Sequence, residues 1–268
     1  MAFASVLRRM HVITLTTDFG LDDWFVGAMK GVITRIAPRV QVIDLTHGIP
    51  PGDIRAGAFA LAAGCRFFPT GTIHLAVVDP GVGSDRNAIA VQTEEYCFVG
   101  PDNGVLSFAL RNERIKRIHA LENKRYLPSS ISQTFHGRDV FAPVAAHLAK
   151  GVPIQKLGSK RNDLERLSWP EPRLDENGIE GEVVYIDRFG NAITNIDAGM
   201  LNRLQAAVCE IGRKPAQKCP VKNCYQAVPT GKPVAVLGSS GFLEIAVNGR
   251  SAAKRLAIKI GTKVVARR

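Results

Sequence analysis

The sequence predicts an N-terminal α/β domain with a mostly parallel sheet and a C-terminal all-β domain that resembles a barrel. In the first part of the chain, apolar runs of strand length alternate with longer runs of helical spacing, which is typical of a parallel α/β sheet. From Gly181 onward, short alternating runs are separated by turn residues, as in a small barrel or sandwich. We expect domains over residues 1–157 and 179–268, joined by a polar, proline-containing linker over 158–178.

Strands and helices alternate through the first half of the N-terminal domain. Residues 11–17 form a β-rich apolar run, and the apolar residues of 24–36 recur at helical spacing. Asp22 and Asp23 suit the start of this helix, and Pro38 suits its end.

The same alternation continues toward the middle of the chain. A strand is predicted over 40–45, a helix over 54–67 with Asp53 as its cap, and a strand over 72–78. Beyond these we expect a hairpin that turns at Glu94 and Glu95, a short helix, a strand and a longer helix. These later elements are predicted over 87–92 and 96–100 for the hairpin, 105–110 for the short helix, 115–120 for the strand and 139–150 for the longer helix.

Polar residues stand where three of the predicted parallel strands end. Asp18 follows the first strand, Thr46 and His47 end the second, and Asp79 follows the third. Open parallel sheets bind ligands outside the carboxyl ends of their strands. The sequence therefore predicts a small-molecule site at this edge of the sheet.

The C-terminal domain is predicted to consist of short strands only. Each run is four to seven residues long and is bounded by glycine, proline or polar turn residues. The predicted strands cover residues 182–186, 192–196, 206–212, 233–237, 243–247, 256–260 and 263–266.

The net charge of +11 is concentrated in the last part of the chain. Residues 213–268 contain twelve Lys and Arg side chains and one acidic residue, Glu244, so the first 212 residues are neutral overall. The basic residues are dispersed and are not interleaved with aromatic residues. This pattern favours a solvated basic surface over a nucleic-acid interface, which we keep as a minor alternative.

Neither a metal site nor a membrane span is expected. The five cysteines have no framework spacing, and Cys209, Cys219 and Cys224 lack the spacing of a zinc site. Reduced cysteines are typical of the cytoplasm, where we expect the protein to reside. No apolar run reaches the roughly 18 residues that a membrane-spanning helix needs.

Several polar residues are candidates for a small-molecule enzyme site. Each also has a purely structural interpretation, since an aspartate after a strand is often a turn or cap residue. Residue types and spacing alone do not identify a reaction. The candidates are Asp18, Asp79, Arg86, His136, Asp187 and Asn191.

Five motifs carry a resemblance to a known family. They are Thr-Thr-Asp-Phe-Gly at 16–20, Val-Val-Asp-Pro-Gly-Val-Gly at 77–83, Gly-Pro-Asp-Asn-Gly at 100–104, Phe-His-Gly-Arg-Asp at 135–139 and Asp-Arg-Phe-Gly-Asn-Ala-Ile-Thr-Asn at 187–195. With these five motifs in this order, the chain resembles the S-adenosyl-L-methionine (SAM) hydroxide adenosyltransferases, which are relatives of fluorinase and chlorinase. The resemblance extends from about residue 11 to residue 266.

The resemblance implies a fold that agrees with the one predicted above. It also implies a homotrimer in which SAM binds between the N-terminal domain of one subunit and the C-terminal domain of the next. The implied reaction converts SAM and water to adenosine and L-methionine by attack on the ribose C5′. SAM is then the substrate, and no cofactor is expected.

The resemblance assigns catalysis to Asp79, Arg86 and His136. Methionine leaves the sulfonium as a neutral molecule, so the reaction needs a positioned water or hydroxide rather than a general acid. A guanidinium stabilises hydroxide, which suits Arg86, while Asp79 and His136 would position the nucleophile and handle its proton. Which of these two takes the proton stays open.

The same resemblance assigns substrate contacts. Asp18 would hold the ribose hydroxyls, Asp187 the methionine ammonium group and Asn191 the adenine edge. The remaining expected contacts are Phe68 and Thr70 near the ribose, Phe189 and Phe242 near the adenine, and Ser239 and Ser240 near the methionine carboxylate.

At three positions the chain differs from the halide-using enzymes, fluorinase and chlorinase. Gly137 stands where those enzymes have a serine associated with halide, Gly52 follows Pro51 where they have tryptophan, and Ser240 stands where they have arginine. These differences favour hydroxide as nucleophile. A halide-using SAM adenosyltransferase is the main alternative.

Overall fold

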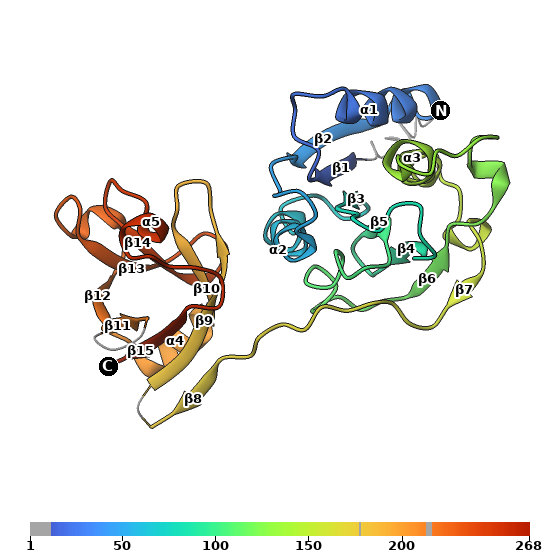
Figure 1. Cartoon of the computed structure of the whole chain (residues 1–268). Coiled ribbons are helices and arrows are strands. Elements are labelled where there is room, and N and C mark those ends of the chain that lie inside the picture. Colours follow the sequence, from blue (N-terminus) through green and yellow to red (C-terminus); the bar gives the residue numbers. More distant parts are fainter. Residues whose placement is uncertain (1–11, 177, 213–215) are drawn as a thin grey trace, which may run out of the picture. The chain divides into compact units, whose positions relative to one another are not determined.

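The computed structural model describes residues 12–176, 178–212 and 216–268. The chain divides into two compact units, with the boundary between Leu167 and Ser168, inside the segment predicted to be a linker (Figure 1). That segment also contains two short strands, Lys160–Arg161 and Arg173–Asp175, each of which joins the sheet of its own unit.

The N-terminal unit contains a seven-stranded mixed sheet in the order β2-β1-β3-β5-β4-β6-β7. The pairs β2–β1, β1–β3 and β3–β5 are parallel, and the other three pairs are antiparallel. This arrangement confirms the predicted α/β class. The strands are β1 Val12–Thr17, β2 Gln41–Thr46, β3 Ile73–Val77, β4 Ala88–Gln92, β5 Cys97–Pro101, β6 Arg117–Ala120 and β7 Lys160–Arg161.

Helices cover both faces of the parallel half of this sheet (Figure 1). Helices α1 (Phe25–Ile36) and α3 (Ala142–Ala149) pack together over the face that carries Leu15 and Leu75. Helix α2 (Ile54–Cys65) covers the other face, where a Cβ on Gly57 would lie 2.8 Å from Cγ2 of Val78. The close approach explains why α2 is built from alanine and glycine, since larger side chains would separate it from the strand ends.

Shorter helical segments complete the N-terminal unit. A π-helix, η2, spans Gly137–Phe141 and runs directly into α3. Two short 3₁₀ helices are η1 at Lys124–Tyr126 and η3 at Ile154–Lys156. The helix predicted over 139–150 is therefore correct in position, but its first turn is a π-helix, which is frequent at functional sites.

Two local predictions for the N-terminal unit were wrong. Helix α1 begins after Trp24 without a side-chain cap, so Asp22 and Asp23 lie outside its first turn. Residues 105–110 form hydrogen-bonded turns rather than a helix. Side-chain oxygens compete there with helical bonds, because Asn103 accepts from the N–H of Val105 at 3.1 Å.

The C-terminal unit contains a closed seven-stranded barrel, which confirms the predicted class. Its strands follow the order β10-β14-β13-β12-β11-β15-β9, and β9 pairs again with β10 to close the ring, while β8 extends β9 at one edge. The strands are β8 Arg173–Asp175, β9 Gly178–Ile186, β10 Ala192–Asp197, β11 Val208–Ile211, β12 Gln217–Lys222, β13 Pro233–Leu237, β14 Phe242–Val247 and β15 Lys263–Arg267.

The predicted strand over 256–260 is wrong, and several elements of the C-terminal unit were missed. Ser251 caps a short helix, α5 (Ala252–Arg255), and Ala257 then has a φ of +51°, so no strand follows. Helix α4 (Ala198–Leu204) and the 3₁₀ helix η4 (Tyr225–Ala227) were not expected. Strand β12 was missed because its lysines and proline hide the alternation.

Among the described residues, no helix is long and apolar enough to cross a bilayer. No group of three or more His, Cys, Asp or Glu side chains in the same part of the chain is arranged to hold a metal ion.

Candidate active site

The carboxyl ends of β1, β2 and β3 meet at one edge of the N-terminal sheet, as their parallel pairing requires. Asp18 follows β1 and accepts a hydrogen bond from the N–H of Gly52 at 2.8 Å. A Cβ on Gly52 would lie 3.7 Å from Cβ of Pro80, the residue after Asp79. The loop bonded to Asp18 therefore lies against the loop that begins at Asp79.

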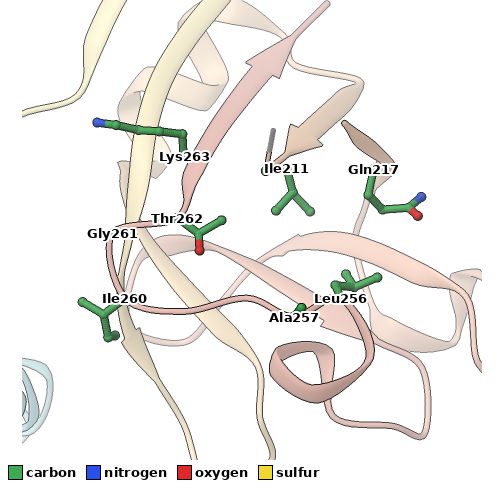
Figure 2. Close-up of a pocket in the computed structure, with 9 residues that line it drawn as sticks. Ile211, Gln217, Leu256, Ala257, Ile260, Gly261, Thr262 and Lys263 are labelled. Atoms are coloured by element: carbon green, nitrogen blue, oxygen red, sulfur yellow. The ribbon is translucent and has the colours of Figure 1, made fainter. Parts of the chain in front are cut away.

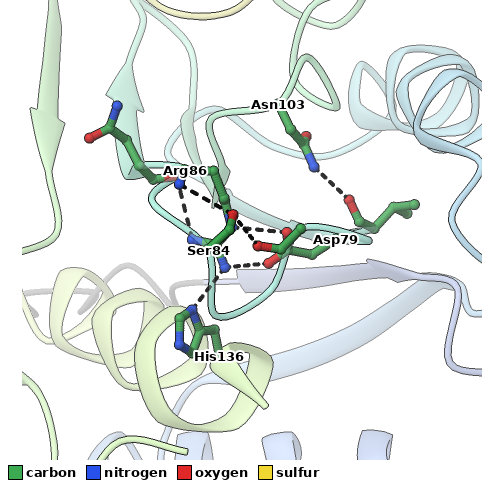
Figure 3. Close-up of polar contacts among 8 residues, drawn as sticks. Asp79, Ser84, Arg86, Asn103 and His136 are labelled. Carbon is green, nitrogen blue, oxygen red and sulfur yellow. Dashed lines mark hydrogen bonds and ion pairs between the residues drawn. The ribbon is translucent and has the colours of Figure 1, made fainter. Parts of the chain in front are cut away.

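Asp79 and Arg86 form a buried bidentate ion pair (Figure 3). The Nε of Arg86 donates to Oδ1 of Asp79 at 2.9 Å, and Nη2 donates to Oδ2. Only 4% of the Asp79 side chain and 11% of the Arg86 side chain are exposed. Parallel N–H···O bonds of this kind fix orientation as well as charge.

The loop between these two residues folds back through successive turns. The N–H of Val82 donates to the carbonyl of Asp79 at 3.1 Å, and Oγ of Ser84 donates to the carbonyl of Gly81 at 2.7 Å. These bonds return Arg86 to the carboxylate seven residues earlier. The glycines therefore serve the turn that returns Arg86 to Asp79.

His136 joins the pair through Arg86 (Figure 3). The Nη2 of Arg86 lies 2.8 Å from Nδ1 of His136. A guanidinium can only donate, so Nδ1 accepts and the neutral ring carries its proton on Nε2. Burial and the positive charge of Arg86 both lower the pKa of His136, which keeps the ring neutral.

The segment around His136 is held by contacts with the Asp79 loop. Gly83 has a φ of +79°, and a Cβ built on it would overlap the carbonyl oxygen of Gln133. Asp139 accepts from the N–H of Ser132 at 2.8 Å and from Arg138 Nε at 2.7 Å, which ties the two ends of this segment together.

An aromatic cluster links His136 to the first strand end. Phe135, next to His136, lies 5.8 Å from Phe19, next to Asp18, and 5.1 Å from Phe25, measured between ring centroids. The rings meet edge to face, a favourable arrangement for aromatic pairs. The structure thus brings Asp18, Asp79, Arg86 and His136 to one region.

Asn103 supports this region and was not assigned a role from the sequence. Its Nδ2 donates to the carbonyl of Val78 at 2.9 Å, which fixes the backbone immediately before Asp79 (Figure 3). Neighbouring Asp102 is buried and accepts from the N–H of Glu165 at 2.8 Å. The Gly-Pro-Asp-Asn-Gly motif contained the signal, since two adjacent polar residues follow a buried strand there.

Phe68 and Thr70 lie away from this region. Both precede β3, whereas Asp79 follows it, so they stand at the opposite edge of the sheet. Thr70 donates to Glu95, and the carbonyl of Phe68 accepts from Oη of Tyr96 at 3.1 Å. The structure does not bring these two residues together with Asp79.

In the C-terminal unit, Asp187 and Asn191 form the turn between β9 and β10. The carboxylate of Asp187 accepts from the backbone N–H of Asn191 at 2.8 Å and from its side-chain amide at 3.1 Å. Phe189, at the tip of the turn, is 78% exposed. The turn therefore exposes the ring of Phe189, while the hydrogen bonds between Asp187 and Asn191 hold its two ends together.

Ser239, Ser240 and Phe242 belong to a second turn, between β13 and β14. The hydroxyl of Ser240 is buried and has no hydrogen-bond partner among the described residues. Phe242 packs against Trp169, with ring centroids 5.4 Å apart. Since β10 and β14 are antiparallel, this turn stands at the opposite end of β10 from Asp187.

Glu244 is a buried acid, paired with Tyr225, that sequence reasoning missed. Oη of Tyr225 donates to Oε1 of Glu244 at 2.7 Å. Burial, followed by repulsion from Asp187, raises the pKa of Glu244. One acidic residue within the apolar strand β14 was the available signal.

A hollow of about 800 Å³ lies at one end of the barrel and contains none of the predicted site residues (Figure 2). Its charged side chain, Lys263, donates to Glu182 at 3.0 Å. Figure 2 shows the Lys263 amine pointing away from Ile211 and Leu256, the apolar walls. The described residues that line this hollow therefore include no acid and base that could act together in catalysis.

Comparison with known families and proteins agrees with this arrangement. Residues 13–158 match the model of the SAM hydroxide adenosyltransferase N-terminal domain, and residues 181–265 match that of the C-terminal domain. The chain is 42% identical over 262 residues to a protein of Thermus thermophilus named (R)-S-adenosyl-L-methionine hydrolase, covering 95% of this chain and 99% of that protein. A protein of Salinispora tropica with the same name is 40% identical over 94% of this chain and 96% of its own length.

More distant and structural relatives complete the comparison. A fluorinase of an Actinoplanes species is 27% identical, covering 94% of this chain and 96% of the fluorinase. A crystal structure of an uncharacterized conserved protein from Thermotoga maritima superposes with a TM-score of 0.89 at 38% identity, covering 95% of this chain and 99% of that one. With both domain models matched and close relatives over nearly its full length, this chain belongs to the SAM hydroxide adenosyltransferase family.

Proposed function

We propose that this protein hydrolyses SAM to adenosine and L-methionine by in-line attack of water or hydroxide on the ribose C5′. The observation that carries the proposal is the partly buried trio in which Arg86 donates to both Asp79 and His136. Relatives at 36–42% identity bear the name of (R)-SAM hydrolase, which supports the same reaction. SAM is the substrate, and the reaction requires no cofactor.

Arg86 has the hydrogen atoms needed to hold an anionic nucleophile. Two of its five N–H groups bind Asp79 and a third binds His136. Its Nη1 makes one long contact, 3.5 Å, to the carbonyl of Asn87. An Nη1–H is therefore available to hydroxide, and its positive charge favours hydroxide over water in a site that excludes bulk solvent.

The tautomer of His136 supports a choice between His136 and Asp79 for the proton transfer. Because Nδ1 accepts from Arg86, the Nε2–H is a donor and orients the oxygen of the nucleophile instead of removing its proton. Asp79 is then the member of the trio that takes the proton. The methionine sulfur leaves as a neutral thioether, so no acid is required on the other side of C5′.

Substrate contacts are proposed from both units. Asp18 keeps Oδ1 for a ribose hydroxyl while Oδ2 accepts from Gly52. The unpaired, buried hydroxyl of Ser240 suits a polar group of the substrate, because a ligand would satisfy it. Asp187 would meet the ammonium group, and Asn191 and Phe189 the adenine.

We also propose a homotrimer in the cytoplasm, with SAM bound between the N-terminal domain of one subunit and the C-terminal domain of the next. The division of the proposed contacts between two units supports this assembly, since neither unit holds them all. Sedimentation equilibrium should give three times the 29.0 kDa chain mass. A monomer at micromolar concentration that retains full activity would exclude it.

The proposal is tested by incubating the purified protein with each sulfonium epimer of SAM, without added halide. Adenosine and methionine should form in equal amounts from the epimer that the relatives' name specifies. Arg86→Lys keeps the charge but loses the two-pronged geometry, so kcat should fall by about 10²-fold or more. Exposed Arg39→Lys is the matched control; intact SAM, or an Arg86→Lys enzyme as active as wild type, contradicts the proposal.

A halide-using reaction is the second candidate because fluorinases are among the relatives. Packing at Gly137 disfavours it. A Cβ there would already lie 3.2 Å from Phe135, 3.3 Å from Met29 and 3.3 Å from Phe19, so a serine at this position would require its neighbours to move. A 5′-halo-5′-deoxyadenosine product at high chloride or fluoride would reverse this preference.

A further inference from the structure

A second polar hollow, of about 420 Å³, lies in the N-terminal unit between α1, η1, η2 and α3. We call it the basic hollow. Its polar lining comes from four elements and consists of Arg35, Arg125, Tyr126, Arg138, Asp139 and His147. The apolar part of the wall includes Val32, Ile36 and Leu127.

The basic hollow has an excess of positive charge that the protein does not neutralise. Asp139 is the one carboxylate among the described residues of its lining, and both of its oxygens accept from Arg138, at 2.7 and 2.8 Å. Neither Arg35 nor Arg125 has an ion-pair partner in the described part of the chain. Arg35 and Arg125 are exposed residues of the lining, and they leave two positive charges at the hollow without an acidic partner.

His147 adds a hydrogen-bond donor to the lining without adding positive charge. His147 lies at the wall with its ring 5.1 Å from that of Tyr126, and its pKa is lowered by burial and by the charge of Lys150. A neutral imidazole beside a phenol can donate a hydrogen bond to an anion without adding to the repulsion. The guanidinium groups of Arg35 and Arg125 come from separate elements, so a ligand between them would join α1 to η1.

We propose that the basic hollow is a binding site for a phosphate dianion, free or carried as a small phosphate ester. Two uncompensated guanidinium groups match the charge of a dianion, and their forked N–H groups match its oxygens. The apolar wall formed by Val32, Ile36 and Leu127 would contact the organic part of an ester. This site is separate from the proposed SAM site, because none of its lining residues belongs to the trio.

Calorimetric titration of the full-length protein without SAM tests the proposal. The two probes are inorganic phosphate and phenyl phosphate, and the variant is Arg35→Gln/Arg125→Gln. The control is Arg39→Gln/Lys124→Gln, which removes the same two charges from exposed residues that are near Arg35 and Arg125 in sequence but do not line the hollow. We expect saturable binding that weakens at least tenfold in the first double variant and is unchanged in the control.

Tighter binding of phenyl phosphate than of phosphate would identify an ester as the preferred form, and equal binding would identify the free anion. Absence of saturable heat with both probes would overturn the proposal. Equal weakening in both double variants would also overturn it, because it would show a general charge effect. None of these results depends on SAM hydrolysis, so the outcome is independent of the proposed function.

Discussion

At the scale of single residues, Arg86 organises the proposed catalytic site. One guanidinium binds the carboxylate that follows β3, seven residues earlier, and an imidazole fifty residues later. It also stacks over the ring of Phe141, with Cζ 5.3 Å from the centroid. These contacts fix the position and the protonation of His136, so in the proposed reaction Arg86 would act through its neighbours as well as by its charge.

A pH dependence follows from the contact between Arg86 and His136. Burial and the charge of Arg86 lower the pKa of His136 from 6.5, so the ring is neutral at pH 7 and becomes protonated below pH 6.5. Protonation removes the acceptor Nδ1 and places two positive charges together. We expect kcat/KM to be flat near neutrality and to fall on the acid side, below pH 6.5.

The pH–rate profile of His136→Gln is the check on this assignment. Glutamine does not titrate, so the acid limb should disappear while the remaining rate is lower at every pH. A wild-type profile whose acid limb persists unchanged in His136→Gln would assign the titration to another group.

At the scale of elements, the loop after β3 and the segment before η2 are in close backbone contact. Gly83 is a point of close approach, because its positive φ and its contact with Gln133 leave no space for a side chain. The π-helix η2 then turns the chain into α3 while His136 remains at its first end. The position of His136 thus depends on a backbone contact between two separate elements.

Gly83→Ala should therefore destabilise the protein and reduce activity together. A left-handed φ costs alanine about 1 kcal/mol, and displacement of the Gln133 carbonyl adds to it, so we expect a loss of roughly 2 kcal/mol in the free energy of unfolding. Urea denaturation measures this loss. The control is Gly31→Ala on the exposed side of α1, where no atom lies within 4 Å of the added Cβ and helix propensity predicts equal or greater stability.

At the scale of the whole molecule, the positive charge of the C-terminal unit is partly neutralised. Lys218 and Arg267 both pair with Glu210, and Lys263 pairs with Glu182 and Glu180. These ion pairs support the interpretation of a solvated basic surface. They remove part of the charge that a nucleic-acid interface would need.

Global stability should depend on pH through His74, which is fully buried in β3. Its Nδ1 bonds Thr14 at 2.7 Å, and burial lowers its pKa to about 4 from 6.5. The native state therefore excludes a proton that the unfolded chain binds below pH 6.5. Stability falls as the pH decreases from 6.5 toward 4, by about 3 kcal/mol over the full range.

Urea denaturation of wild type and His74→Gln at pH 7 and pH 4.5 measures this contribution. Glutamine can keep a hydrogen bond with Thr14 but does not titrate. The difference in unfolding free energy between the two pH values should be smaller in the variant. An equal difference in both proteins would mean that His74 does not set the acid sensitivity.

Local sequence signals determined most of the elements and part of the site. The alternation of strands and helices predicted the α/β unit, and polar residues after strands identified Asp18 and Asp79, because burial forces strands to be apolar and their ends to be polar. The hairpin formed by β4 and β5 and the Asp53 cap of α2 followed from equally local patterns. Local patterns failed at two places. At β12, lysines obscured the alternation of a strand, and at 105–110, side-chain hydrogen bonds replaced those of the predicted helix.

Family motifs in the sequence, and not local periodicity, grouped Arg86 and His136 with Asp79. Only the tertiary structure decided that Arg86 bridges the other two, that His136 accepts through Nδ1, and that Phe68 and Thr70 stand at the far edge of the sheet. It also closed the barrel through the β9–β10 pair and formed the basic hollow from four elements. These features depend on contacts between residues distant in sequence, whose geometry is set by packing of the whole unit.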